Sequence, residues 1–289
     1  MYKDQELTII IPCYNEEDAI YDTILSVYNL LDSAGISASI MVVNDGSTDN
    51  SSEEIKRASD YAELINLPRN HGYGYAIKTG LRHAKSEWIA IIDADLTYHP
   101  KDLITIWQER EVADMIVGAR TGKRVNIPLL RRPMKYILRK FAGWLAGESI
   151  DDLNSGIRLF KKIDASRFLK LYPDGFSFTT TITMSYLSSQ LSIRFIPIDY
   201  NKRKGKSKIR PLHDSYQFIL LLMKLAVYYN PLKVFIPIAF SLFFLSLLSI
   251  IYDIFIIRNL GDKTVLLITL GLITFLLGLI ADLIIKRTQ

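Results

Sequence analysis

The chain has 289 residues, of which 49% are hydrophobic, and its mean hydropathy of +0.16 is high for a soluble protein. The formal net charge of +5 is modest and is concentrated near the apolar segments, which favours anionic lipid or phosphate over nucleic acid, and no nucleic-acid module is recognisable. The single cysteine, Cys13, excludes an internal disulfide, and because residues 1–6 lack basic and apolar regions we expect no cleavable signal peptide.

Short apolar strands alternate with helices from the N-terminus onward. Residues 7–11 predict a buried strand that Pro12 ends, and residues 16–34 have apolar residues at helical spacing. Further strands are expected at residues 38–43, 62–67, 88–92 and 115–118, with a helix running to Ala84 after the third strand. This alternation predicts an α/β, doubly wound sheet whose polar loops gather at the carboxyl ends of the strands.

Two carboxylates, Asp93 and Asp95, follow the apolar strand at residues 88–92. At the carboxyl edge of a sheet, carboxylates one residue apart can share a divalent cation through hard oxygen ligands. Asp45, which follows the second strand, is expected on the same rim. The alternative is that these residues only form turns and caps, for which Asp is well suited. Gly72 and Gly74 lack the G-x-G-x-x-G spacing and do not predict a dinucleotide site.

Basic amphipathic segments follow residue 120. Residues 123–140 mix cations with apolar residues, which suits a helix on a membrane surface, although a solvated helix face explains the same pattern. Residues 211–230 are expected to form an interfacial helix that carries tyrosines near its end. The segment before it is strongly basic through Lys202, Arg203, Lys204, Lys206, Lys208 and Arg210.

The C-terminal part predicts a transmembrane hairpin. Residues 234–252 and 264–281 contain no charged residue, and each run approaches the length needed to cross a bilayer. We place the spans at about residues 232–257 and 263–285, so that the chain divides into 1–210, 211–230 and 231–289. The basic residues before and after the hairpin favour an integral membrane protein whose N-terminal part and C-terminus face the cytoplasm.

Four stretches resemble glycosyltransferase family 2, the inverting enzymes of the GT-A fold: IIPCYNEE, VVNDGSTDN, NHGYGYAIKTG and DADLTYHP. Three later stretches are similar to its polyprenyl-phosphate branch, typified by dolichol-phosphate mannose synthase: DDLNSGIRLFKK, GFSFTTTITM and YNKRKGKSKIRP. The resemblance covers about residues 6–210 and implies a GT-A catalytic domain there.

The resemblance also implies roles for particular residues. The nucleotide-sugar site would comprise Pro12, Tyr14, Glu16, Val43, Asp45, Asp93, Ala94, Asp95 and Arg120. Within it, Asp93 and Asp95 would bind Mg²⁺ or Mn²⁺ and, together with Arg203, would carry catalysis. The acceptor and its phosphate would meet Ser155, Gly156, Arg203 and Lys208.

The implied reaction is the transfer, with inversion, of one sugar from a GDP- or UDP-linked donor, GDP-mannose or a UDP-hexose, to polyprenyl or dolichyl phosphate at the cytoplasmic face. A lipid phosphate is mostly ionised at neutral pH and needs no general base, which agrees with Thr181 near where many members carry an acidic residue. Asn44 and Thr97 also depart from the usual Asp and Gln of the family, which weakens the choice of mannose as the sugar.

Two alternatives stay open. One is a glycosyltransferase of polysaccharide or glycolipid assembly with a non-phosphate acceptor, although the Q-x-x-R-W motif of processive synthases is absent. The other is a catalytically silent membrane adaptor, against which the intact Asp45, Asp93, Asp95 and Arg203 argue. The donor sugar, the lipid and a homo-oligomeric state are not readable from the sequence.

Overall fold

The computed structural model describes residues 6–122, 132–175, 177–201, 220, 223, 227 and 230–288, without the side chains of 132–135 and 286–288. The chain forms two compact units, Met1–Phe218 and Ile219–Gln289. The predicted interfacial helix at 211–230 and the basic segment at 202–210 lie almost entirely outside the described residues, so both stay predictions.

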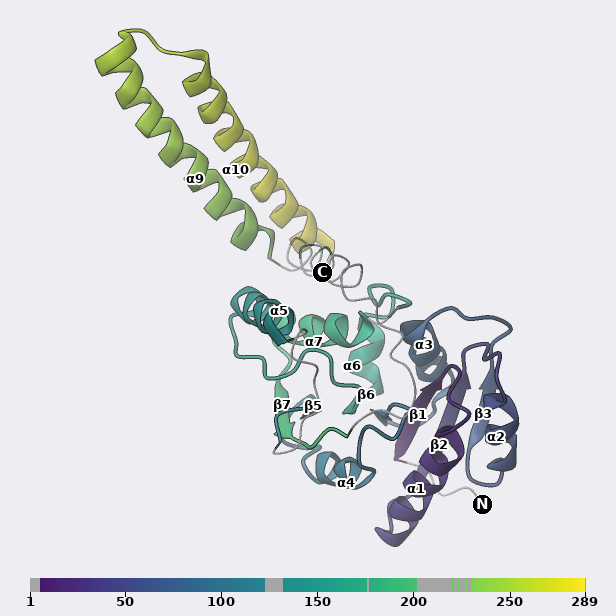
Figure 1. Cartoon of the computed structure of the whole chain (residues 1–289). Helices are drawn as coiled ribbons and strands as arrows, with labels where there is room; N and C mark the ends of the chain where they lie inside the picture. The colour runs from purple at the N-terminus through teal and green to yellow at the C-terminus, as the bar shows by residue number, and fades with distance from the viewer. Residues whose placement is uncertain are drawn as a thin grey trace. The chain divides into compact units, whose positions relative to one another are not determined.

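A seven-stranded sheet in the order β3-β2-β1-β4-β6-β5-β7 forms the centre of the N-terminal unit (Figure 1). The strands are β1 (Leu7–Cys13), β2 (Ala38–Asn44), β3 (Glu63–Asn66), β4 (Trp88–Ile91), β5 (Met115–Ala119), β6 (Arg158–Lys161) and β7 (Ile193–Pro197). β6 is antiparallel to both of its neighbours, while the other described pairs are parallel. The five strands expected from the sequence are all present, and β6 and β7 were missed.

Pro12 does not end the first strand, contrary to the prediction, because β1 continues to Cys13 with Pro12 paired to Val43. β4 pairs with β1 only from Leu7 to Ile10, so Pro12 lies where β1 has a ladder on one side only. A proline is tolerated at such a position because its missing N–H interrupts no ladder. β1 and β2 therefore end together at the site edge.

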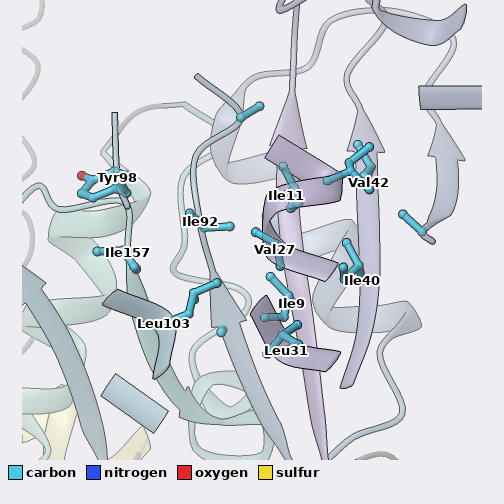
Figure 2. Packing of buried hydrophobic residues seen from close by; sticks show 14 of the residues in the cluster. Ile9, Ile11, Val27, Leu31, Ile40, Val42, Ile92, Tyr98, Leu103 and Ile157 are labelled. Atoms are coloured by element: carbon cyan, nitrogen blue, oxygen red, sulfur yellow. The ribbon is translucent and has the colours of Figure 1, made fainter. Parts of the chain in front are cut away.

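Helices cover both faces of the sheet. They are α1 (Ile20–Ser33), α2 (Ser51–Arg57), α3 (Tyr73–His83), α4 (Lys101–Gln108), α5 (Arg132–Ala146), α6 (Lys162–Arg167) and α7 (Phe178–Ser188). Alternate residues of β1 enter different cores: Ile9 and Ile11 pack beneath α1, as Figure 2 shows, whereas Ile10 packs beneath α3. This two-sided burial explains the unbroken apolar runs of the strands.

The C-terminal unit is a hairpin of α9 (Pro231–Tyr252), a π-helical turn η2 (Asp253–Ile257) and α10 (Asp262–Thr288). Two spans of sufficient length and apolarity for a bilayer, Pro231–Ile257 and Asp262–Ile285, agree closely with the predicted ones. At the turn, Oδ2 of Asp253 accepts hydrogen bonds from the Gly261 N–H and the Thr264 hydroxyl, each at 2.7 Å. The buried carboxylate thus closes the connection between the helices.

Candidate active site at the carboxyl edge of the sheet

Asp45 anchors the loop that precedes α3. Its two carboxylate oxygens accept the backbone N–H groups of His71 and Gly72, at 2.8 and 2.7 Å, and its side chain is buried. The Asp45 N–H itself donates to the carbonyl oxygen of Cys13 at 2.8 Å, so the ends of β1 and β2 are held together. Asp45 therefore positions this loop at the sheet edge, where the family resemblance implies a nucleotide-binding carboxylate.

Asp93 lies between the α3 loop and the loop before β6. The Tyr73 hydroxyl donates to Asp93 Oδ1 at 2.9 Å. On the other side, a Cβ atom at Gly156 would overlap the Asp93 carboxylate, so only glycine permits this approach. The Gly156 N–H donates to the Tyr98 hydroxyl oxygen at 2.7 Å, which fixes the backbone there. Burial and the neighbouring Asp93 raise the pKa of Tyr73 well above its usual value, so its hydroxyl stays a donor at physiological pH.

Asp95 is buried and is held by a tight turn. Its Oδ1 accepts from the Thr97 hydroxyl at 2.5 Å and from the Thr97 N–H at 3.2 Å. Leu96 between them has a φ of +57°, a left-handed conformation that is unfavourable for a leucine. Backbone strain therefore accompanies the folding of Thr97 back onto Asp95, so Thr97 is an orienting residue in this chain.

The remaining residues predicted for the nucleotide site lie on neighbouring segments. Pro12 and Val43 are register partners on β1 and β2, and the Ala94 carbonyl accepts from the Thr23 hydroxyl at 3.1 Å. The Glu16 N–H donates to the Ser51 hydroxyl at 2.8 Å, so the loop that contains Tyr14 and Glu16 is joined to the start of α2. The fold thus brings the loops after β1, β2 and β4 to one edge of the sheet.

Arg120 forms a nearly buried ion pair with Asp152, and this pair was not predicted from the sequence. Its Nε and Nη2 donate to the two Asp152 oxygens at 2.7 and 2.8 Å, and its own N–H donates to Oδ2 at 3.1 Å. Burial opposes both charges, yet the Arg120 guanidinium holds the pKa of Asp152 below its usual range. The Arg120 guanidinium also lies over the Tyr200 ring, 5.2 Å from its centroid.

Arg158, at the start of β6, is fully buried and was also missed. Its guanidinium donates to the Ser155 carbonyl from Nη2 at 2.6 Å and from Nε at 3.2 Å, and to the Thr179 carbonyl from Nη1 at 3.1 Å. Burial lowers its pKa. Arg158 therefore ties the loop that contains Ser155 and Gly156 to the first turn of α7.

The residues considered for the acceptor site differ in what the structure shows of them. The Ser155 hydroxyl donates to the Gly118 carbonyl of β5 at 2.5 Å and is buried, so it stabilises the loop. Thr181 of α7 is also buried, and its hydroxyl donates at 2.9 Å to the carbonyl of Ser177, the residue that precedes α7. Arg203 and Lys208 lie outside the described residues, and their predicted roles stay predictions.

The oxygen ligands that the protein supplies fit a divalent metal whose remaining ligands come from a substrate and water. Over the described ranges, no group of three or more His, Cys, Asp or Glu side chains is placed to hold an ion. Asp93 and Asp95 supply hard oxygen atoms from one loop, and Mg²⁺ commonly takes one or two carboxylates with the rest of its shell from water and substrate phosphates. The pair therefore suits a metal–diphosphate complex better than a closed structural site.

The sheet, with its antiparallel β6 and the carboxylate pair after β4, defines a GT-A-type α/β transferase domain. The chain belongs to glycosyltransferase family 2, since the model described as glycosyl transferase family 2 matches residues 8–172. A second model, the GtrB C-terminal hairpin, matches residues 230–286 and agrees with the paired apolar helices.

Curated relatives of this chain are named as polyprenyl-phosphate or glycan sugar transferases. A dolichyl-phosphate beta-glucosyltransferase, ALG5C, of Trichomonas vaginalis is 27% identical over 77% of this chain and 71% of its own length. The low-salt glycan biosynthesis hexosyltransferase Agl6 of Haloferax volcanii is 27% identical over 75% of this chain and 53% of its own. The undecaprenyl-phosphate 4-deoxy-4-formamido-L-arabinose transferase of Salmonella typhimurium is 26% identical over 55% and 49%. The chain thus spans about half the length of the latter two.

Solved structures share the fold. Glucosyl-3-phosphoglycerate synthase from Mycobacterium tuberculosis, in complex with Mn²⁺, UDP and phosphoglyceric acid, superposes with a TM-score of 0.60 at 17% identity over 77% of this chain and 78% of that one. A complex of the same enzyme with Mg²⁺ and UDP has a TM-score of 0.59 at 18% identity, over 77% and 79%. At this identity the likeness supports the GT-A-type fold.

Proposed function

We propose that this protein transfers one sugar, with inversion, from a nucleotide sugar to a polyprenyl or dolichyl phosphate at the cytoplasmic face of a membrane. The observation that carries the proposal is the Asp93–Asp95 pair at the carboxyl edge of a GT-A-type sheet, in a chain that also carries a hairpin of membrane-spanning length. The names of the relatives support the acceptor class, and the Mn²⁺ and Mg²⁺ complexes of the structural neighbour support a divalent metal.

The residues of the site suit departure of a nucleoside diphosphate. A bound Mg²⁺ or Mn²⁺ would neutralise the negative charge that develops on the leaving diphosphate. Asp93 and Asp95 would hold that ion, with Asp93 oriented by Tyr73 and Asp95 by Thr97. Arg203 and Lys208, for which the family resemblance implies phosphate contacts, would add charge-assisted donors.

The acceptor side agrees with a phosphate nucleophile. A phosphate monoester with a second pKa near about 6 is largely ionised at neutral pH and needs no carboxylate base. Near the position where the family resemblance implies an acidic residue in many members, this chain carries Thr181, whose hydroxyl donates to the Ser177 carbonyl. An alcohol acceptor would instead require a base within hydrogen-bond reach of its proton.

The test is transfer of label from a panel of GDP- and UDP-sugars into extractable polyprenyl phosphate by the full chain with Mn²⁺. Asp95→Asn keeps the shape of the side chain and removes its charge, and Asp60→Asn is the matched control on an exposed turn. Label in a mild-acid-labile lipid from one donor, lost in Asp95→Asn and retained in Asp60→Asn, supports the proposal and names the sugar. Nucleotide binding without lipid labelling rejects the lipid-phosphate acceptor and leaves the polysaccharide or glycolipid alternative. Absence of nucleotide binding with Mn²⁺ leaves the silent adaptor.

A further inference from the structure

One hydroxyl group holds the backbone of the loop before β6. Gly156 is buried, and β6 begins two residues beyond it, at Arg158. The Gly156 N–H donates to the hydroxyl oxygen of Tyr98 at 2.7 Å, and the Ser155 Oγ lies 3.4 Å from the same oxygen. Because a buried N–H without a partner is strongly disfavoured, the bond to Tyr98 determines where the Gly156 backbone lies.

The same glycine lies against a candidate metal-binding carboxylate. The three atoms nearest to a Cβ built on Gly156 all belong to the Asp93 carboxyl group. The Gly156 backbone therefore lies between the Tyr98 hydroxyl on its N–H side and the Asp93 carboxylate on its Cα side. Any shift of this backbone changes the space that the Asp93 carboxylate can occupy.

Tyr98 is a firm support for this loop, because its own side chain is buried. Tyr98 is 3% exposed, and its ring meets the Tyr200 ring edge-on with a centroid separation of 5.3 Å. Tyr98 belongs to the same apolar core as Leu103 and Ile157, which Figure 2 also labels. Since a tightly packed ring has little freedom to move, the Gly156 N–H is attached to a fixed point.

The turn after Asp95 thus reaches both carboxylates. Thr97 donates directly to Asp95, and the next residue, Tyr98, acts on Asp93 through Gly156. We propose that Tyr98 is a positioning residue for both halves of the site, because it keeps the acceptor loop and the Asp93 carboxylate together. The role rests on the proposed function, and it requires no contact of Tyr98 with the metal or the substrate.

Tyr98→Phe removes one oxygen atom and keeps the ring. With the full chain in detergent, we would measure Mn²⁺ binding in the presence of UDP or GDP from the electron paramagnetic resonance signal of free Mn²⁺. The dissociation constant of Mn²⁺ is expected to rise by about tenfold, at the low end for loss of an orienting partner. Tyr186→Phe is the matched control and should leave it unchanged, since Tyr186 is fully buried and its hydroxyl has no hydrogen-bond partner among the described residues.

An unchanged Mn²⁺ dissociation constant in Tyr98→Phe overturns the positioning role, even if the thermal transition of the variant falls. A wild type that binds no Mn²⁺ with either nucleotide rejects the proposed function, and the role of Tyr98 with it. Mn²⁺ binding by the wild type without sugar transfer to lipid rejects the acceptor class alone, because the binding readout needs no activity.

The acceptor side gives a second readout. At saturating Mn²⁺, Tyr98→Phe is expected to raise the KM for polyprenyl phosphate by up to about tenfold, because a small displacement of a positioned group is costly. Tyr73→Phe, which removes a donor to Asp93, should leave this KM unchanged. Equal KM values in wild type and Tyr98→Phe contradict a role on both halves of the site.

A double-mutant cycle separates positioning from general destabilisation. If Tyr98 acts through Gly156, adding Tyr98→Phe to Gly156→Ala should weaken Mn²⁺ binding by less than about twofold beyond Gly156→Ala alone, since residues that act through one contact are not additive. Two independent defects would instead multiply. Effects that multiply therefore overturn the proposal.

Discussion

The Tyr73 hydroxyl and the missing side chain of Gly156 both help to position Asp93. The Tyr73 hydroxyl fixes Oδ1, and Gly156 leaves room for the carboxylate. Loss of a group that orients a metal-binding carboxylate typically lowers metal affinity by about 10- to 100-fold. At the residue scale, the candidate metal site therefore extends to side chains that would not touch the ion.

Tyr73→Phe removes the donor to Asp93 and retains the ring. We expect the Mn²⁺ concentration for half-maximal transfer to rise by about tenfold, at the low end for loss of an orienting partner. The maximal rate at saturating Mn²⁺ should fall less, because Asp93 itself remains. Tyr75→Phe is the matched control, since the Tyr75 ring stacks on His71 at 4.4 Å and no hydroxyl bond of Tyr75 is described. An unchanged Mn²⁺ dependence in Tyr73→Phe assigns this tyrosine to packing alone.

Gly156→Ala tests the missing side chain. Its methyl group would overlap the Asp93 carboxylate, so the loop or Asp93 must move, and we expect transfer to fall by at least about 100-fold. At Gly175 a Cβ meets no atom within 4 Å, so Gly175→Ala should retain activity within about twofold. Nucleotide binding without metal, measured by calorimetry, should survive in both variants. Equal activities in the two variants would show that Asp93 does not require this approach.

Some roles of single residues could be predicted from the sequence, and others could not. The carboxylate pair was predictable because strand, turn and acidic residues are adjacent in the chain. The role of Tyr73 was not predictable, because its contact with Asp93 joins positions 20 residues apart through two loops. Ser155 and Gly156 were predicted from the resemblance as acceptor residues. The structure shows that the Gly156 N–H donates to Tyr98 and that the Ser155 carbonyl accepts from Arg158. Such contacts depend on loop conformation, which no local pattern encodes.

At the scale of elements, the Arg120–Asp152 pair joins the end of β5 to the segment before β6. Because both groups are nearly buried, removal of one partner leaves an uncompensated charge and costs about 3–5 kcal/mol. We expect Asp152→Asn to lower the thermal transition of the N-terminal unit, in detergent and near pH 7, by roughly 6–12 °C. Glu54→Gln breaks the exposed Arg57–Glu54 pair and should shift the transition by under about 2 °C.

The same pair predicts a pH dependence. The pKa of Asp152 is depressed in the folded protein, so its contribution is fully present above the unfolded value of about 3.9 and is lost as the pH falls toward the folded value. The difference between wild type and Asp152→Asn should therefore be constant from neutral pH down to about pH 5 and should shrink below it. A difference that grows on acidification would show that another group dominates.

β6 and β7 were not predicted, for a physical reason. β6 has four residues, Arg158–Lys161, and contains a fully buried arginine, which is rare in strands. β7, Ile193–Pro197, is an edge strand with a partly exposed pattern and a terminal proline. Both strands pair with β5, so their positions in the sheet cannot be predicted from their own short sequences. The long apolar runs of β1, β2, β4 and the hairpin were predictable, because a segment with an apolar environment on all sides consists almost entirely of apolar residues.

At the scale of the whole molecule, the proposed reaction requires a defined topology. Nucleotide sugars are charged and would be drawn from the cytoplasm, so the N-terminal unit should lie on that side. The distribution of cations agrees: the flanks of the hairpin carry Lys202, Arg203, Lys204, Lys206, Lys208, Arg210, Lys286 and Arg287, and the link carries Arg258 and Lys263. Short segments rich in Lys and Arg are retained on the cytoplasmic side.

Because Cys13 is the only cysteine and is buried, single-cysteine reporters can test this topology. In a Cys13→Ala background, Asn259→Cys places a thiol on the exposed link between the spans, and Lys56→Cys places one on exposed α2. With sealed right-side-out vesicles from producing cells, we expect a membrane-impermeant maleimide to label Asn259→Cys at once and Lys56→Cys only after disruption.

The reverse pattern would put the catalytic edge on the side without nucleotide sugar. Protection of both thiols until disruption would mean that the hairpin enters the bilayer without crossing it, and both results would contradict the proposed topology.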